Sequence, residues 1–173
     1  MEFDLKLISK EINERMWTAH KTLSTAESCT AGRVSSIITA VPGSSNYFRG
    51  GLVCYQNDVK EEMLGVKPET IAEHTVVSEA VAREMVIGAN KLFKSDFAVA
   101  ITGYAGPGGA DAVGSSVIVG NIWIAVGNEE HMVTKLIEED NGREKNLAQA
   151  TAVAMHMLRD YIVEKCPAKT EEE

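Results

Sequence analysis

Three segments of the sequence carry residue types that could perform acyl transfer, and the first of them contains a serine. Ser28 lies in Glu27-Ser-Cys-Thr-Ala-Gly32, where a predicted strand ends and a predicted helix begins. Ligands usually bind at the carboxyl ends of strands in open α/β sheets, and a helix N-terminus would favour a developing oxyanion there. Capping of the helix by Ser28 or Thr30 is the structural alternative, because both residue types are standard N-caps.

The second segment supplies a lysine that could act as the base for this serine. It runs from Gly50 to Lys60, and Tyr55 ends its predicted strand before a polar turn. No histidine lies in a motif with Ser28, but a lysine can accept the serine proton if burial or a nearby cation lowers its pKa from about 10.4. A solvated surface position for Lys60 is the alternative, since lysines are seldom buried.

The third segment is rich in glycine and follows a predicted buried strand. It reads Ile101-Thr-Gly-Tyr-Ala-Gly-Pro-Gly-Gly109, and its glycines would let backbone N–H groups approach a ligand closely. A surface turn without function is an equally reasonable alternative. The segment matches neither a P-loop nor a dinucleotide fingerprint, and the sequence holds no GxSxG motif. Ser44-Ser45 resembles a serine-rich amidase loop, but no matching lysine context surrounds it.

Metal and thiol chemistry find little support in the sequence. The four histidines are scattered without metal-ligand spacing, so we expect no metal and no cofactor. The three cysteines form no CxxC pair, which indicates reduced thiols in the cytoplasm. Cys29 could be a nucleophile, but no histidine partner is in view.

Charge and hydropathy limit the partners. A net charge of −8 argues against a nucleic-acid partner, because phosphate-backbone binding needs clustered Lys and Arg. The apolar runs are too short to span a membrane, and the charged N-terminus does not resemble a signal peptide. We therefore expect a cytoplasmic protein with a small-molecule ligand.

Hydrophobic periodicity predicts the elements that position the three segments. Strands are expected over 22–26, 52–55 and 98–102, and a hairpin is expected over 121–126 and 132–137 around Gly127-Asn128. One helix should begin near Cys29 and end at Pro42-Gly43, and another should be capped by Ser78. The four helices show these apolar faces: Leu5, Ile8, Ile12 and Met16; Val34, Ile37, Ile38 and Val41; Val81, Met85, Ala89 and Leu92; Leu147, Ala150, Ala154, Leu158 and Tyr161.

The alternation of strands and helices, followed by a late hairpin, predicts the fold class. We expect an α/β protein, a three-layer α/β/α sandwich with a mixed sheet of about five strands. One domain should cover residues 1–166, because no repeat or linker is visible. The remaining stretch, 167–173, has nothing apolar to bury and is expected to be a disordered tail.

The order of the motifs resembles one family closely. TAESCTAG, VPGSSNYFRGGLVCYQNDVK, MLGV, HTVVSEAVAREM and ITGYAGPGG are similar to the C-terminal domain of the competence/damage-inducible protein CinA over roughly residues 7–160. That family includes the stand-alone nicotinamide-nucleotide amidase, or NMN deamidase. The resemblance implies metal-independent hydrolysis of nicotinamide mononucleotide to nicotinate mononucleotide and ammonia, a three-layer fold and a homodimer. The N-terminal nucleotidyl domain of longer members is not expected here.

The resemblance also implies roles for individual residues. Ser28 matches the nucleophilic serine, and Lys60 matches the proposed base. Tyr55 matches a tyrosine beside that pair and is expected to be catalytic too, by relaying or orienting the serine proton. Thr102 and Arg143 fall on positions linked to the site or the substrate. The complete set of residues expected to bind the mononucleotide is Thr30, Gly32, Asn57, Thr102, Gly103, Gly106 and Arg143.

Three departures from the family pattern keep a second function open. Ala110 to Gly120 replaces a proline-bearing, glycine-rich stretch with bulkier residues. Asn141-Gly142-Arg143 stands where the family has Gly-Asp-Arg, and Leu147 stands where an arginine is usual. The alternative function is a catalytically weakened or inactive nucleotide-binding or scaffold module of the same fold. Release of ammonia from the mononucleotide would distinguish the two.

Overall fold

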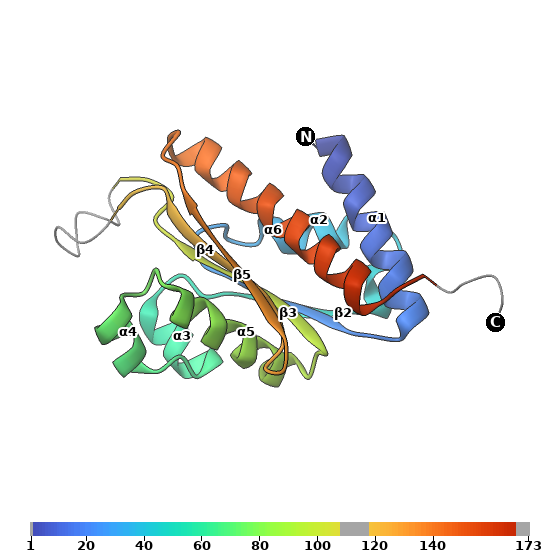
Figure 1. Cartoon of the computed structure of the whole chain (residues 1–173), viewed down its shortest axis with the longest axis horizontal. Coiled ribbons are helices and arrows are strands. Elements are labelled where there is room, and N and C mark those ends of the chain that lie inside the picture. The colour runs from blue at the N-terminus through green and yellow to red at the C-terminus, as the bar shows by residue number, and fades with distance from the viewer. Residues whose placement is uncertain (1, 108–117, 169–173) are drawn as a thin grey trace.

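The computed structural model describes residues 2–107 and 118–168, and its centre is one mixed sheet (Figure 1). The five strands are β1 (Leu23–Glu27), β2 (Phe48–Val53), β3 (Phe97–Gly103), β4 (Asn121–Gly127) and β5 (Met132–Glu138), in the order β2-β1-β3-β4-β5. β1 pairs in parallel with β2 and with β3, whereas β3, β4 and β5 are antiparallel neighbours. The parallel strands bring the segments that follow β1, β2 and β3 to one end of the sheet.

Helices cover both faces of the sheet and complete the predicted three-layer sandwich (Figure 1). One layer contains α1 (Glu2–Ala19), α2 (Arg33–Thr39) and α6 (Arg143–Lys165). The other contains α3 (Asn57–Leu64), α4 (Pro68–His74) and α5 (Glu79–Phe93), and a short 3-10 helix, η1 (Ser44–Asn46), precedes β2. The predicted fold class is therefore confirmed.

The central strand β3 contributes to a hydrophobic core on each face. Val99 and Ile101 pack in the core beneath α1, α2 and α6, whereas Ala98 and Ala100 belong to the core beneath α5. Alternation of side chains between faces is the normal geometry of a strand. Because β3 is buried on both sides, the residues that follow it are held firmly at the edge of the sheet.

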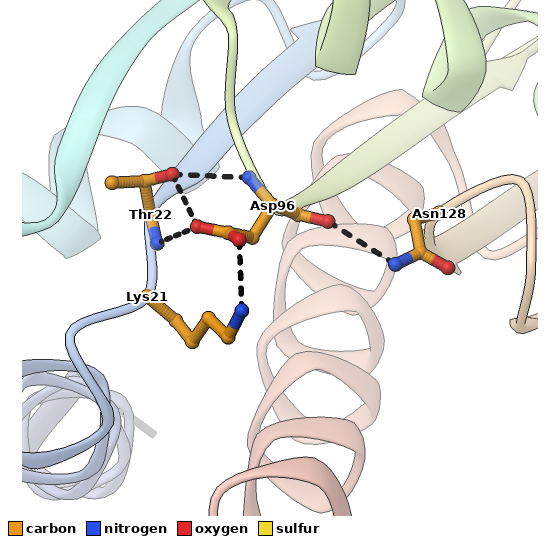
Figure 2. A network of polar contacts seen from close by, with 4 residues as sticks. All are labelled: Lys21, Thr22, Asp96 and Asn128. Atoms are coloured by element: carbon orange, nitrogen blue, oxygen red, sulfur yellow. Dashed lines mark hydrogen bonds and ion pairs between the residues drawn. The ribbon is translucent and has the colours of Figure 1, made fainter.

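A polar network fastens the opposite end of β1 and β3 (Figure 2). Asp96 accepts hydrogen bonds from the Thr22 N–H at 2.8 Å, the Thr22 hydroxyl at 2.7 Å and the Lys21 Nζ at 3.0 Å. Asn128, in the β4–β5 turn, donates to the Asp96 carbonyl at 3.3 Å. Burial acts to raise the pKa of Asp96, but the hydrogen bonds from Thr22 and Lys21 outweigh it and leave that pKa lowered. The network is satisfied within the fold and fixes the strands on which the other end depends.

Most of the predicted elements are confirmed. The hairpin is antiparallel, Ser78 caps α5 by accepting from the Val81 N–H at 3.3 Å, and the predicted inner faces of α1 and α6 are buried. In α5 the prediction for Leu92 is wrong, because this side chain is 40% exposed near the end of the helix. No helix among the described residues is both long and apolar enough to cross a membrane.

Three boundaries differ from the predictions. α2 begins at Arg33 instead of near Cys29, because Ala31 and Gly32 have φ values of 50° and 92°, outside the helical region. β2 begins at Phe48 and ends at Val53, so Tyr55 lies beyond the strand. The polar turn before Lys60 is in fact the start of α3, and α3 and α4 were not predicted. The predictions for 108–117 and for most of the tail, 169–173, lie outside the described residues.

Candidate active site

A cleft of about 860 Å³ lies at the carboxyl ends of β1 and β3, where the polar segments meet. It is bounded by the turn after β1, the start of α3, the α4–α5 loop, the glycine segment after β3 and the start of α6. Eight of the ten residues expected to act in catalysis or to bind the nucleotide line it: Ser28, Tyr55, Asn57, Lys60, Thr102, Gly103, Gly106 and Arg143. Thr30 and Gly32 do not line it.

Ser28 sits in the turn directly after β1, with its backbone held on both sides. Its N–H donates to the Ile101 carbonyl of β3 at 3.0 Å, and its carbonyl accepts from the Ala31 N–H at 3.1 Å. The side chain is buried at the cleft wall, and its hydroxyl has no hydrogen-bond partner within residues 2–107 and 118–168. The hydroxyl is thus positioned by the backbone but remains uncommitted.

The carboxylate of Glu27, next to Ser28, organises this turn and the start of α2. It is 1% exposed and accepts hydrogen bonds from five donors. The donors are the Thr30 hydroxyl and the Gly32, Val34 and Ser35 N–H groups, together with the Ser35 hydroxyl, at 2.7–3.2 Å. Capping by Ser28 or Thr30 is therefore wrong: the N-cap residue Gly32 offers no side chain, and Glu27 satisfies the helix N-terminus from the preceding strand.

Lys60 is buried, which contradicts the alternative of a surface lysine. Its side chain is 1% exposed, and its Nζ donates to the Cys54 carbonyl at 2.8 Å and the Tyr55 carbonyl at 3.5 Å. No carboxylate of the described chain lies within ion-pair distance of the Nζ. Burial lowers the pKa of Lys60, and the nearby Cys54, Cys29 and Asp58 oppose this only in part. The lysine thus has the environment of a potential base.

Backbone hydrogen bonds link Lys60 to the end of β1, directly before Ser28. The Cys54 N–H donates to the Glu27 carbonyl at 2.9 Å, and the Cys54 carbonyl in turn accepts from Lys60. The end of β1 and the lysine are therefore joined through a single intermediate residue.

Tyr55 and Arg143 meet across the cleft from distant parts of the chain. The Arg143 Nη2 donates to the Tyr55 hydroxyl at 3.0 Å, and Tyr55 is 52% exposed. Gly106 packs against the stem of the arginine, so closely that an added Cβ would lie 2.8 Å from the Arg143 Cβ. The glycine segment therefore helps to set where Arg143, the first residue of α6, can lie.

The glycine segment is anchored by two side chains, those of Thr102 and Asn146. The sequence predicts a ligand-binding role for the first and no role for the second. The Thr102 hydroxyl donates to the Val76 carbonyl at 2.9 Å and so holds the α4–α5 loop. Buried Asn146 of α6, which was not predicted, donates to the Ala105 carbonyl and to the Asp140 carboxylate, each at 2.9 Å. Hydrogen bonds from Asn146 and the Gly142 N–H lower the pKa of Asp140. Gly103 fits closely against Ile122, where an added Cβ would come within 2.5 Å of that side chain.

The remaining reactive group at the cleft is Cys29. Burial raises the pKa of its thiol to about 12, although Arg143 and Lys60 act to lower it. A thiol with this pKa is protonated near neutral pH and is a poor nucleophile. No group of three or more metal-ligating side chains was found in the part of the chain that the structure describes. The arrangement best suits acyl transfer by a serine with a buried lysine as its base.

Comparisons with known proteins show which family the chain resembles. A family model described as the CinA C-terminal domain matches residues 5–162. The nicotinamide-nucleotide amidohydrolase PncC of Escherichia coli K12 is 38% identical over 156 residues, which cover 90% of this chain and 93% of that protein. A CinA-like protein of Flavobacterium psychrophilum is 41% identical over 142 residues, 82% of this chain but only 33% of the longer protein.

Solved structures extend the likeness to the fold. The competence/damage-inducible protein CihA from Agrobacterium tumefaciens has a TM-score of 0.82 at 33% identity, covering 89% of this chain and 93% of its own. A CinA-superfamily protein from Klebsiella pneumoniae has a TM-score of 0.84 at 29% identity, covering 92% of this chain and 98% of its own. Each match therefore covers about nine-tenths of the chain.

Proposed function

This chain belongs to the CinA C-terminal domain family, and from this premise we propose that it is a nicotinamide-nucleotide amidohydrolase. The reaction is hydrolysis of nicotinamide mononucleotide to nicotinate mononucleotide and ammonia. Relatives whose name states this activity align with nine-tenths of the chain. The observation that carries the proposal is a buried lysine in the same cleft as a serine, where the described part of the chain supplies neither an ion-pair partner for the lysine nor a hydrogen-bond partner for the serine hydroxyl.

The surroundings of Lys60 support its role as the base. A neutral amine has two N–H bonds and one lone pair, and the Cys54 and Tyr55 carbonyls can accept both N–H groups. The lone pair is then free to take a proton. Burial favours this neutral form, because it penalises the charged ammonium.

In the first half of the proposed reaction, Lys60 removes the proton of the Ser28 hydroxyl while the serine oxygen attacks the carboxamide carbon. The carbonyl oxygen becomes an oxyanion, and Cys29 is a candidate donor to it because its N–H has no backbone acceptor within the described chain. The Tyr104 N–H is a poorer candidate, since it donates to the Asn121 carbonyl at 3.0 Å. The C–N bond then breaks, the protonated lysine supplies the proton of ammonia, and an ester to Ser28 remains.

In the second half, water attacks the ester and Lys60 accepts its proton. The tetrahedral intermediate collapses, the proton returns to the Ser28 oxygen, and the free acid leaves. We propose that these steps need only protein groups and water, without a metal. Tyr55 can orient the nucleotide from the cleft wall, and Arg143 can bind its phosphate while bonded to Tyr55.

The other residues expected to bind the nucleotide fall into two groups, those that line the cleft and those that hold the serine turn. Asn57, Gly103 and Gly106 line the cleft and can contact the nucleotide directly. Thr30 and Gly32 bond to Glu27, and we propose that they act by holding the serine turn in place.

The decisive experiment measures ammonia release from nicotinamide mononucleotide by purified, chelator-treated protein. We expect release by the wild type and none by Ser28→Ala, with the thermal midpoint of the variant close to wild type because only one hydroxyl is removed. Ser36→Ala, on the exposed side of α2, is the matched control and should remain active. Retained turnover in Ser28→Ala would indicate that Cys29 or Thr30, and not Ser28, is the nucleophile. A wild type that binds the nucleotide without releasing ammonia would support the scaffold alternative.

We also propose that the protein is a homodimer in a reducing compartment such as the cytoplasm. Edge strand β2 and the neighbouring α3 expose Val53 and Met63 by about half, at 49% and 47%, and symmetric oligomers are common. All three cysteines are free thiols. Light scattering at micromolar concentration should give twice 18.7 kDa, and a mass near 18.7 kDa would reject the dimer.

A further inference from the structure

The charged side chains that line the cleft differ in how far hydrogen bonds from the protein satisfy them. They are Asp58, Lys60 and Arg143 among the described residues. The Lys60 amine is directed to two backbone carbonyls, and the Arg143 guanidinium donates to the Tyr55 hydroxyl. Among the described residues, Asp58 is the only carboxylate of this lining, and it contributes a negative charge that neither cation neutralises by direct contact.

Asp58 is the second residue of α3, and the helix explains only part of its environment. Its Oδ1 accepts from the Val59 N–H at 2.9 Å, as an acid in the first turn of a helix often does. Its other oxygen has no hydrogen-bond or ion-pair partner in the described part of the chain. The sequence between 108 and 117 contains no Lys, Arg or His that could supply one.

Two aromatic side chains of the same lining favour the same kind of ligand. Tyr55 and Tyr104 contribute to the walls of the cleft. The faces of aromatic rings attract cations, and more strongly where the site is desolvated. A carboxylate together with tyrosine rings is the chemistry that recognises a positively charged, flat organic group.

We propose that Asp58 is a specificity-determining residue that selects ligands with a cationic aromatic ring. The inference rests on the proposed function, because the pyridinium ring of an oxidised nicotinamide nucleotide carries this charge. With the carboxamide at Ser28 and the phosphate toward Arg143, the ring lies between them, inside the cleft that Asp58 lines. The reduced dihydropyridine form has nearly the same shape and no ring charge, so Asp58 distinguishes the two by electrostatics alone.

The test compares binding of the two ring forms to protein that cannot turn them over. Isothermal titration of Ser28→Ala with nicotinamide mononucleotide and with its 1,4-dihydro form gives the ratio of the two dissociation constants. We expect the cationic form to bind more tightly. Because Asp58 is exposed, Asp58→Asn in the same background should reduce this preference about two- to fivefold, as for an exposed charge pair. Asp58→Glu should keep most of the preference, because it keeps the charge.

Glu62→Gln is the matched control, since it removes the same charge from an exposed position of α3 that does not line the cleft. An equal fall in the ratio for Glu62→Gln, or an unchanged ratio for Asp58→Asn, would overturn the inference. Failure of both ring forms to bind would overturn it too. Ammonia release by the protein with Ser28 intact tests the proposed function separately: an Asp58-dependent ratio without ammonia release would leave the inference standing and reject the amidase.

Discussion

Replacing Glu27 by glutamine should lower the stability of the protein while leaving hydrolysis measurable in the molecules that are folded. The change removes a buried negative charge and turns one acceptor oxygen into an NH₂ group of similar size. Three donors meet at Oε2, from Thr30, Gly32 and Val34, and two meet at Oε1, both from Ser35. A glutamine can satisfy only one of these sets, because its nitrogen faces N–H and O–H donors on the other side.

The expected loss of stability is estimated from the smaller set of donors, the N–H and hydroxyl of Ser35. Two hydrogen bonds to a charged group contribute about 1.5–3 kcal/mol each, or about 3–6 kcal/mol if simply added. Relief of the cost of burying the charge offsets part of this loss. We expect the free energy of unfolding to fall by about 2–4 kcal/mol and the thermal midpoint by roughly 5–15 °C for a chain of this size.

Urea unfolding and ammonia release, measured on the same preparations, check the prediction. The expected result is a lower unfolding midpoint with measurable hydrolysis at a temperature where Glu27→Gln is folded. Glu62→Gln should leave the free energy of unfolding within about 0.5 kcal/mol of the wild-type value, as surface changes usually do. An inactive Glu27→Gln with an unchanged midpoint would refute the reasoning, and the carboxylate would then have to act in the reaction.

Three further predictions concern the cleft. Lys60→Arg should be inactive, because arginine keeps the charge but is not deprotonated in proteins; a rate near wild type would reduce the lysine to an electrostatic support. Because burial lowers the pKa of Lys60 and its neutral form exists only above that pKa, kcat/KM should fall as the pH drops through it; a profile without an acid limb would contradict the assignment. Gly106→Ala should raise KM several-fold with a smaller change in kcat, because the new Cβ would lie 2.8 Å from the Arg143 Cβ and displace this side chain; an unchanged KM would show that the contact does not position the arginine.

The sequence predicts long amphipathic elements well and short ones poorly. The apolar spacing from Leu5 to Met16 identifies α1, because its period is sustained over several turns. α3 and α4 have only 8 and 7 residues, too few for a clear period. The start of α2 was misplaced because the segment is rich in capping residue types, whereas the positive φ of Gly32 and the distant carboxylate decide where the helix begins.

The candidate site could be identified from the sequence, but its internal contacts could not. The order of the motifs pointed to Ser28, Lys60 and Arg143, and these residues line one cleft. The burial of Lys60 depends on how α3 packs beneath α5, which no local pattern reports. Glu27 and Asn146 each organise a loop of the site. In the sequence they are only an acid at the end of a strand and an asparagine near the start of a helix, and no motif marks them.

The buried amine of Lys60 has a consequence for how the family can diverge. Desolvating this group opposes folding, and among the described residues the nearby carboxylate of Asp58 offsets this cost only in part. Methionine has a similar length and no charge to desolvate, so Lys60→Met should melt at a higher temperature than wild type while releasing no ammonia. A lower melting temperature would mean that the two hydrogen bonds to the carbonyls stabilise the fold more than burial of the amine weakens it. Where selection for activity is relaxed, replacement of Lys60 by an apolar residue would therefore increase the stability of the fold. An apolar residue at position 60 is thus the first feature to look for in relatives that have lost the activity.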